Sequence, residues 1–145
     1  VHDEGAALMG GVAGHAGLFS NAYDLAQLYQ LLLNNGTLNG IRLLQPATIQ
    51  LFTAYGSPNS RRGLGFDKPE KDNETRKDPY PSLSAPPETY GHTGFTGICV
   101  WADPINNLLF IFMSNRVNPT RNNNLLSQLN VRSNIQDAIY QAIQR

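Results

Sequence analysis

The sequence predicts an α+β domain in which helices pack against an antiparallel sheet. Two strand-like runs, 98–102 and 108–114, are joined by a short connection rich in Pro and Asn, which is typical of a β-hairpin. Amphipathic helical patterns precede the hairpin at 22–33 and follow it at 135–143. The 145 residues, 41% of them hydrophobic, suit one domain with a modest core.

The chain begins with a glycine-rich segment, residues 5–17, which we interpret as a tightly turned connection. It has neither the G-x-G-x-x-G pattern of dinucleotide sites nor the Gly-Lys-Ser/Thr of a P-loop, which argues against nucleotide binding. Asn21 is the expected cap of the first helix. The apolar side chains of this helix recur at i, i+3, i+4 and i+7, and Gly36 is expected to end it in the αL conformation.

The middle of the chain contains shorter elements and a change of composition. Asn39-Gly40 predicts a turn before an extended piece at 41–44, and Pro46 opens a second helix that reaches about residue 54. A short strand is expected at 63–66. Residues 67–87 alternate in charge and contain several prolines, so we expect an inserted, solvated loop without regular structure.

The last third of the chain is expected to supply the rest of the sheet and a final helix. A strand starting at Tyr90 forms one edge of this sheet, and the fully apolar run 108–114 predicts a central strand. Cys99 and Trp101 are expected in the core. A polar loop at 118–124 then leads to a helix capped by Ser133 or Asn134.

Charge and composition exclude several classes of function. A formal net charge of +0 and a pI near 7.0 give no electrostatic attraction to nucleic acid or anionic lipid. The longest apolar run is strand-sized, so we expect no membrane span. A single cysteine excludes an internal disulfide. The candidate metal ligands lack a characteristic spacing, so neither a metal site nor a cofactor is expected; they are His2, Asp3, Glu4, His15 and His92.

Residues 90–97, which contain His92-Thr93-Gly94, are the strongest candidate for a functional site. Glycine in an extended segment lets another backbone or a ligand come close, because it has no Cβ. His92 supplies a titratable nitrogen and Thr93 a hydroxyl group. The pattern predicts one wall of an active-site groove; the alternative for His92 is a structural strand histidine, hydrogen-bonded to its neighbours.

This motif, with the upstream block from Gly11 to Ser20, the following Asp24-Leu25-Ala26 and the flanking hairpin, resembles the C-terminal part of the serine β-lactamase and penicillin-binding-protein superfamily. The similarity is to the class C-like, esterase-type branch, in which His-Thr-Gly is a variant of the Lys-Thr-Gly box. It implies a β-lactamase/transpeptidase-like fold, of which residues 1–145 would be a single, incomplete C-terminal portion. It also implies a periplasmic or extracytoplasmic location.

The resemblance also implies roles for individual residues. His92 would replace the lysine that sets the electrostatics and proton traffic of the site, and Thr93 would bind the carboxylate or acyl group of the substrate. The backbone N–H of Phe95 would be one of two oxyanion-hole donors. Gly94 would keep the strand approachable, and the remaining substrate-binding candidates are Thr96 and His15.

The family's nucleophile, the serine of Ser-x-x-Lys, has no match in these residues. The lysines all lie in the charged loop, and the strings that imitate the second box, Tyr55-Gly56-Ser57 and Tyr80-Pro81-Ser82, lie in the wrong context. We therefore expect part of a serine hydrolase that cleaves an ester, amide or β-lactam bond of a small acyl or peptide-like substrate through an acyl-enzyme. Residues 1–145 would need the missing N-terminal part of the same polypeptide as a partner, and we expect them to be inactive without it.

Two further expectations concern partners. The alternative to an enzyme is a non-catalytic module that binds peptidoglycan or another ligand. Because the family's sheet continues beyond the last strand, Leu108 to Met113 should form an exposed edge through which two chains can pair, so a homodimer or swapped assembly is expected.

Overall fold

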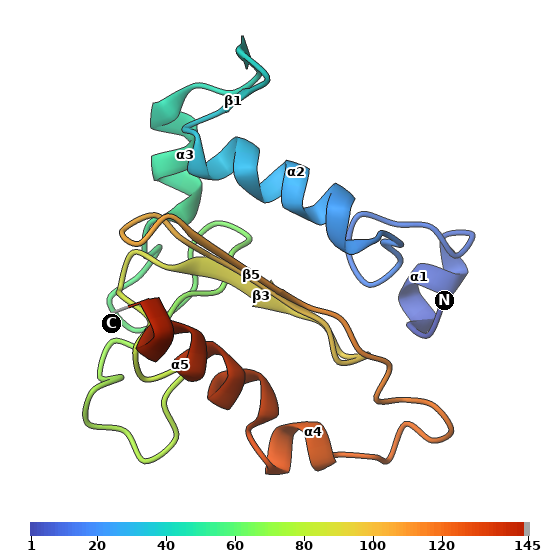
Figure 1. The fold of residues 1–145 in the computed structure, drawn as a ribbon. Helices are drawn as coiled ribbons and strands as arrows, with labels where there is room; N and C mark the ends of the chain where they lie inside the picture. The colour runs from blue at the N-terminus through green and yellow to red at the C-terminus, as the bar shows by residue number, and fades with distance from the viewer. Residues whose placement is uncertain (144–145) are drawn as a thin grey trace.

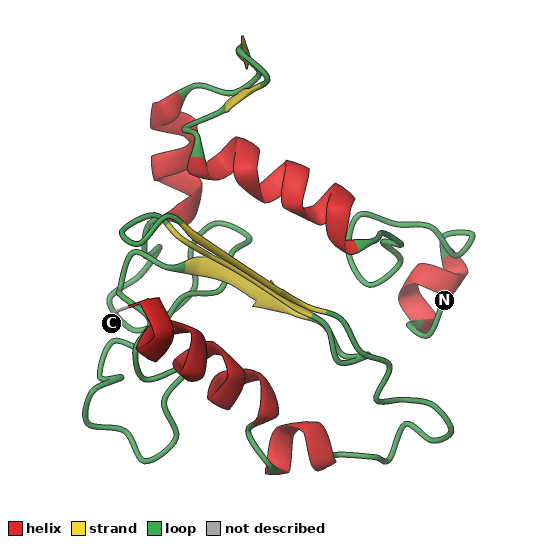
Figure 2. Ribbon diagram, in the orientation of Figure 1, coloured by secondary structure: helices red, strands yellow, loops and turns green. Residues whose placement is uncertain are grey.

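A computed structural model describes residues 1–143 and has a three-stranded antiparallel sheet between two helical layers. The helix α2 crosses one face of the sheet and α5 lies along the other (Figure 1, Figure 2). The elements in chain order are α1 (Glu4–Leu8), α2 (Ala22–Leu33), β1 (Thr37–Leu38), β2 (Ile41–Arg42), α3 (Pro46–Thr53), β3 (Tyr90–Thr93), β4 (Cys99–Asp103), β5 (Leu108–Phe112), α4 (Leu125–Gln128) and α5 (Val131–Ile143). The predicted α+β class is confirmed.

The sheet has the order β3–β4–β5, with both pairs antiparallel. The strand that starts at Tyr90 forms one edge, as predicted. The prediction of a central strand at 108–114 is wrong, because β4 pairs on both sides whereas β5 pairs only with β4 within the described residues. The apolar character of β5 is explained by the helices that cover both faces of the sheet.

Each face of the sheet has its own apolar cluster. On the α2 side, Tyr29 packs with Tyr90, Val100 and Ala102. On the α5 side, a second cluster is formed by Cys99, Trp101 and Phe110, with Ile139 packed against it. The alternation of β4 side chains between these clusters follows from the two-residue period of a strand. Cys99 and Trp101 are buried, as the sequence predicted.

Local signals in the first half of the chain are confirmed. Asn21 Oδ1 accepts a hydrogen bond from the Asp24 N–H (3.0 Å) and so caps α2. Gly36 follows the helix with φ 89°, and its N–H donates to the carbonyl oxygen of Leu31 (2.8 Å). Asn39-Gly40 makes the turn between the short strands β1 and β2. The helix expected from Pro46 is α3.

Three local predictions are corrected. The glycine-rich segment contains α1, because Asp3 Oδ1 accepts from the Ala6 N–H (2.8 Å) and supplies a cap. Residues 63–66 form no strand, since Gly65 has φ 90°, and only the neighbouring bridge between Asp67 and Gly91 is formed. The last helix begins at Val131 rather than at residue 133 or 134, after a separate short α4 that was not predicted.

The loop 67–87 has no helix or regular strand, as expected, but much of it is not solvated. Asp67, Lys68, Asn73 and Ser82 are all buried. Internal hydrogen bonds replace water for several of these polar groups; for example, Asn73 Nδ2 donates to the Ser82 carbonyl oxygen (2.7 Å). Asp137 on α5 accepts hydrogen bonds from two backbone N–H groups of the loop, at 3.4 and 3.0 Å. The loop is therefore packed against the body of the domain.

The described residues also bear on the membrane prediction. Across residues 1–143 we find no helix whose length and apolar character would let it traverse a lipid bilayer.

Candidate active site

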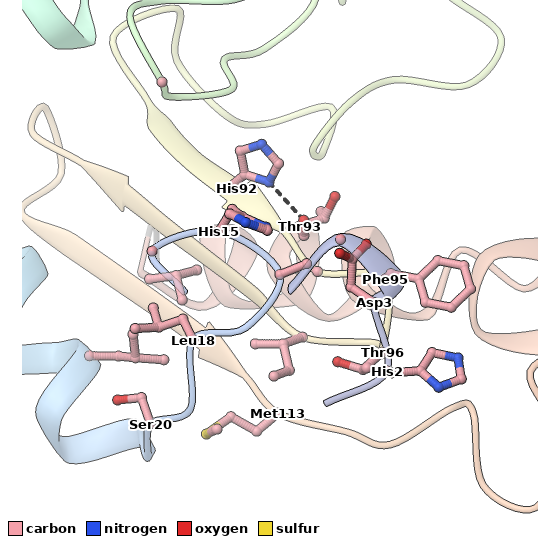
Figure 3. Close-up of a pocket in the computed structure, with 18 of the residues that line it drawn as sticks. His2, Asp3, His15, Leu18, Ser20, His92, Thr93, Phe95, Thr96 and Met113 are labelled. Carbon is pink, nitrogen blue, oxygen red and sulfur yellow. Dashed lines mark hydrogen bonds between the residues drawn. The ribbon is translucent and has the colours of Figure 1, made fainter. Parts of the chain in front are cut away.

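A cavity of about 910 Å³ lies at the end of β3, where the glycine-rich segment wraps past the sheet (Figure 3). Residues from distant parts of the chain line this cavity. All six of the site residues expected from the sequence are among them: His15, His92, Thr93, Gly94, Phe95 and Thr96. His2 and Asp3 also line the cavity. The fold thus gathers the whole predicted set around one space.

The pairing of β3 with β4 explains how His92 and Thr93 are presented. His92 is opposite Val100 and Thr93 is opposite Cys99. Because Val100 and Cys99 belong to clusters on opposite faces, His92 projects toward the α2 side and Thr93 toward the α5 side. The His92 side chain is exposed and Thr93 is half-buried. Both residues line the cavity, which lies where the edge strand β3 ends.

Both ring nitrogens of His92 make hydrogen bonds. Nδ1 lies 2.7 Å from the carbonyl oxygen of Thr93, the contact drawn in Figure 3. Nε2 lies 2.8 Å from Nη1 of Arg62. His92 therefore combines the two interpretations made from the sequence: it is hydrogen-bonded to its neighbours and it also faces the cavity.

A buried carboxylate, that of Asp67, binds Arg61 and also Arg62, the arginine that contacts His92. Asp67 is 1% exposed and accepts from Arg61 Nε (2.8 Å), Arg61 Nη2 (3.3 Å) and the Tyr80 hydroxyl (2.7 Å). Arg62 Nε lies 3.5 Å from the same carboxylate. Burial acts to raise the pKa of Asp67, but the hydrogen bonds and the arginine charges outweigh it, so the pKa is lower than the ordinary value. Asp67 is therefore charged at neutral pH.

The loop after β3 is held by Arg116. Its Nε donates to the Phe95 carbonyl oxygen (2.6 Å), its backbone N–H donates to the Thr96 carbonyl oxygen (2.9 Å), and its guanidinium carbon lies 4.3 Å from the centre of the Phe95 ring. His2 stacks on the same ring at 5.5 Å. Among the residues described, the Phe95 N–H donates no hydrogen bond. Phe95 is also one of the residues that line the cavity.

Two glycines in this motif are required by close contacts. A Cβ on Gly91 would overlap the Val100 carbonyl oxygen and would lie 2.8 Å from Cε3 of Trp101. Gly97 has φ 114°, and a Cβ there would overlap the Ser114 hydroxyl. Gly91 therefore allows β3 to pack closely against β4, and Gly97 allows the loop between these two strands to turn.

Sequence reasoning missed Arg62 and Arg116. Each acts across a long separation, 30 residues from Arg62 to His92 and 21 residues from Arg116 to Phe95, so no local spacing indicated the contact.

In residues 1–143, no cluster of three or more His, Cys, Asp or Glu side chains is arranged to hold a metal ion.

Comparison with known proteins identifies the family. A family model described as Beta-lactamase matches residues 1–132. The chain belongs to the β-lactamase family. The resemblance inferred from its sequence is confirmed, and His92-Thr93-Gly94 in this β-lactamase-family chain lies where β3 meets the cavity.

Similar proteins are longer than this chain. A candidate D-alanyl-D-alanine carboxypeptidase of Escherichia coli (strain K12) is 39% identical over 131 residues, which cover 86% of this chain and 30% of that protein. A relative with the same description from Salmonella enteritidis PT4 (strain P125109) is 39% identical over 117 residues, covering 80% and 26%. The β-lactamase-family chain thus spans about 30% of the length of the first of these relatives.

A solved structure is also similar to part of this chain. It is described as a candidate β-lactamase from Bacteroides dorei DSM 17855 and matches with a TM-score of 0.45 and 13% sequence identity. The match covers 85% of this chain and 47% of that chain.

Proposed function

We propose that the chain forms one wall of the active site of a serine hydrolase that cleaves an amide, ester or β-lactam bond through an acyl-enzyme. The observation that carries this proposal is the convergence of all six expected residues on one cavity of about 910 Å³. The names of the similar proteins favour the terminal peptide bond of a cell-wall D-alanyl-D-alanine peptide as the substrate.

In this proposal each residue has a defined role. The Phe95 N–H donates to the negative oxygen that develops during acyl transfer, because a preorganised donor in a sheltered site stabilises that charge. Thr93 binds the carboxylate or acyl group of the substrate, and Gly94 lets the substrate approach the end of β3. His92 sets the local electrostatics. Thr96 and His15 contact the substrate from the loop and from the glycine-rich segment.

The attacking hydroxyl is proposed to come from polypeptide outside these 145 residues. Acyl transfer requires a serine next to a base, and no serine here precedes a lysine with the Ser-x-x-Lys spacing. The chain alone is therefore inactive in this proposal. Association with the rest of a longer polypeptide, consistent with the 30% coverage of the Escherichia coli relative, completes the site.

Turnover of nitrocefin, p-nitrophenyl acetate and a peptide ending in D-Ala-D-Ala tests the proposal. The longest polypeptide that contains these residues should hydrolyse at least one of them, and the 145-residue chain should hydrolyse none. Thr93→Val in the longer polypeptide should lower kcat/KM about tenfold or more, because it removes one hydrogen bond from a partly desolvated site. An unchanged kcat/KM would contradict the role of Thr93, and turnover by the chain alone would contradict the proposed incompleteness.

We also propose that the free edge of β5 lets two copies of this chain pair. The outer backbone groups of Leu108–Phe112 have no strand partner among residues 1–143, and such an edge favours pairing with another strand. Light scattering of the 145-residue chain should therefore give a dimer or a swapped assembly. A monodisperse monomer in which β5 amides are well protected from hydrogen exchange would contradict this assembly.

A further inference from the structure

The imidazole of His92 is held from both sides by groups with fixed hydrogen-bonding roles. A carbonyl oxygen only accepts, and a guanidinium group only donates. Nδ1 faces the Thr93 carbonyl oxygen at 2.7 Å, so Nδ1 must carry the proton. Nε2 faces Nη1 of Arg62 at 2.8 Å, so Nε2 must present its lone pair. Only the neutral Nδ1–H tautomer satisfies both contacts.

The position of Arg62 is itself determined by the fold. Its Nε lies 3.5 Å from the buried carboxylate of Asp67. The backbone of Asp67 exchanges two hydrogen bonds with Gly91, the residue before His92, at 2.8 and 3.0 Å. The carboxylate that holds the guanidinium group and the strand that carries the imidazole are therefore parts of one hydrogen-bonded unit.

We propose that Arg62 is a positioning residue that holds His92 in its neutral Nδ1–H tautomer and occupies the Nε2 lone pair. Two consequences follow for the site, and they rest on the function proposed above. The Nε2 lone pair of His92 accepts from Arg62 and is not offered to a substrate while Arg62 is in place. The positive charge next to the His92 imidazole is that of the Arg62 guanidinium group.

The tautomer is measured directly on the 145-residue chain. Two-bond ¹H–¹⁵N correlation spectra distinguish a protonated ring nitrogen from an unprotonated one. Wild-type His92 should show a protonated Nδ1 and an unprotonated Nε2. A spectrum with the proton on Nε2, or with averaging between the two tautomers, would overturn the proposal.

The occupation of the lone pair is measured by chemical modification. Diethyl pyrocarbonate acylates an unprotonated imidazole nitrogen through its lone pair, and mass spectrometry gives a rate for each of the three histidines. Arg62→Met keeps a side chain of similar length without a donor, and it should speed acylation of His92 about fivefold, the scale of a partly exposed charged contact. The rates for His2 and His15 should not change, and Arg62→Lys, which restores a charged donor, should recover part of the protection.

The acylation assay also supplies a control variant and the result that would overturn the proposal. Arg42→Met removes an exposed arginine of the β1–β2 hairpin and should leave the His92 rate unchanged. An unchanged His92 rate in Arg62→Met would overturn the proposal. Neither readout requires turnover: an inactive longer polypeptide whose His92 has the Nδ1–H tautomer would defeat only the proposed function, and an active one with the proton on Nε2 would defeat only this inference.

Discussion

Replacing the buried carboxylate of Asp67 should destabilise the whole domain. Asp67→Asn keeps the size of the side chain but removes the charge that faces Arg61 and Arg62, and one of its two oxygens becomes a donor. Breaking one partner of a buried ion pair costs about 3–5 kcal/mol. The guanidinium groups of Arg61 and Arg62 are 30% and 51% exposed, so water can solvate them once the carboxylate is lost. We therefore expect the unfolding free energy to fall by about 3 kcal/mol, the lower end of that range.

The assay is urea unfolding followed by the fluorescence of Trp101, the single tryptophan, whose ring lies 5.4 Å from that of Tyr80. Asp72→Asn is the matched control, because that carboxylate is 61% exposed and should change the free energy by less than about 0.5 kcal/mol. A loss below about 1 kcal/mol for Asp67→Asn would show that the buried carboxylate contributes little to the stability of the domain.

The same substitution has a defined pH dependence. Since the pKa of Asp67 is lowered by folding, its stabilisation is fully present above the unfolded value of about 3.9 and is lost as the pH falls through the folded value. The free energies of wild type and Asp67→Asn should therefore differ at pH 7 and converge as the pH falls below about 4. A difference that stays constant down to pH 3 would show that the charge is not responsible.

Three other predictions test packing and burial. Gly91→Ala should cost about 1–3 kcal/mol in urea unfolding because the added methyl group meets the backbone of β4, whereas Gly94→Ala, whose nearest neighbour would be 3.6 Å away, should cost much less. Burial raises the pKa of the Cys99 thiol to about 11, so an aromatic disulfide reagent at pH 8 should label it far faster in urea than in native buffer; equal rates would contradict its burial. Tyr140→Phe should lower the free energy of unfolding by about 1–2 kcal/mol, because the buried Tyr140 hydroxyl donates to Asp103 at 2.8 Å; an unchanged melting temperature would count against this.

The features that could be predicted from the sequence depend on residues close together in the chain. Asn21 and Gly36 define the two ends of α2 through bonds spanning three to five residues. The β4–β5 hairpin follows from two strand-like runs and a short connection. The motif at residues 92–96 was recognised because its residues are contiguous.

The features that could not be predicted depend on contacts between distant segments. The loop 67–87 has the composition of a solvated segment, yet Asp67 is buried because Arg61 and Tyr80 satisfy its carboxylate. The bond between Arg62 and His92 joins residues 30 apart, and nothing in either local sequence indicates it. The apolar composition of β5 suggested a central strand, but it shows only that both faces of the strand are covered. The edge position depends on which strands are present, and it was expected only from the family resemblance.

Covalent labelling with a fluorescent penicillin tests most directly whether this chain is one wall of a serine-hydrolase site whose nucleophile lies elsewhere. We expect that the longest polypeptide containing these residues is labelled, that the 145-residue chain is not, and that peptide mapping places the label on a serine outside residues 1–145. A label on any serine within residues 1–145 would show that this chain carries the nucleophile itself.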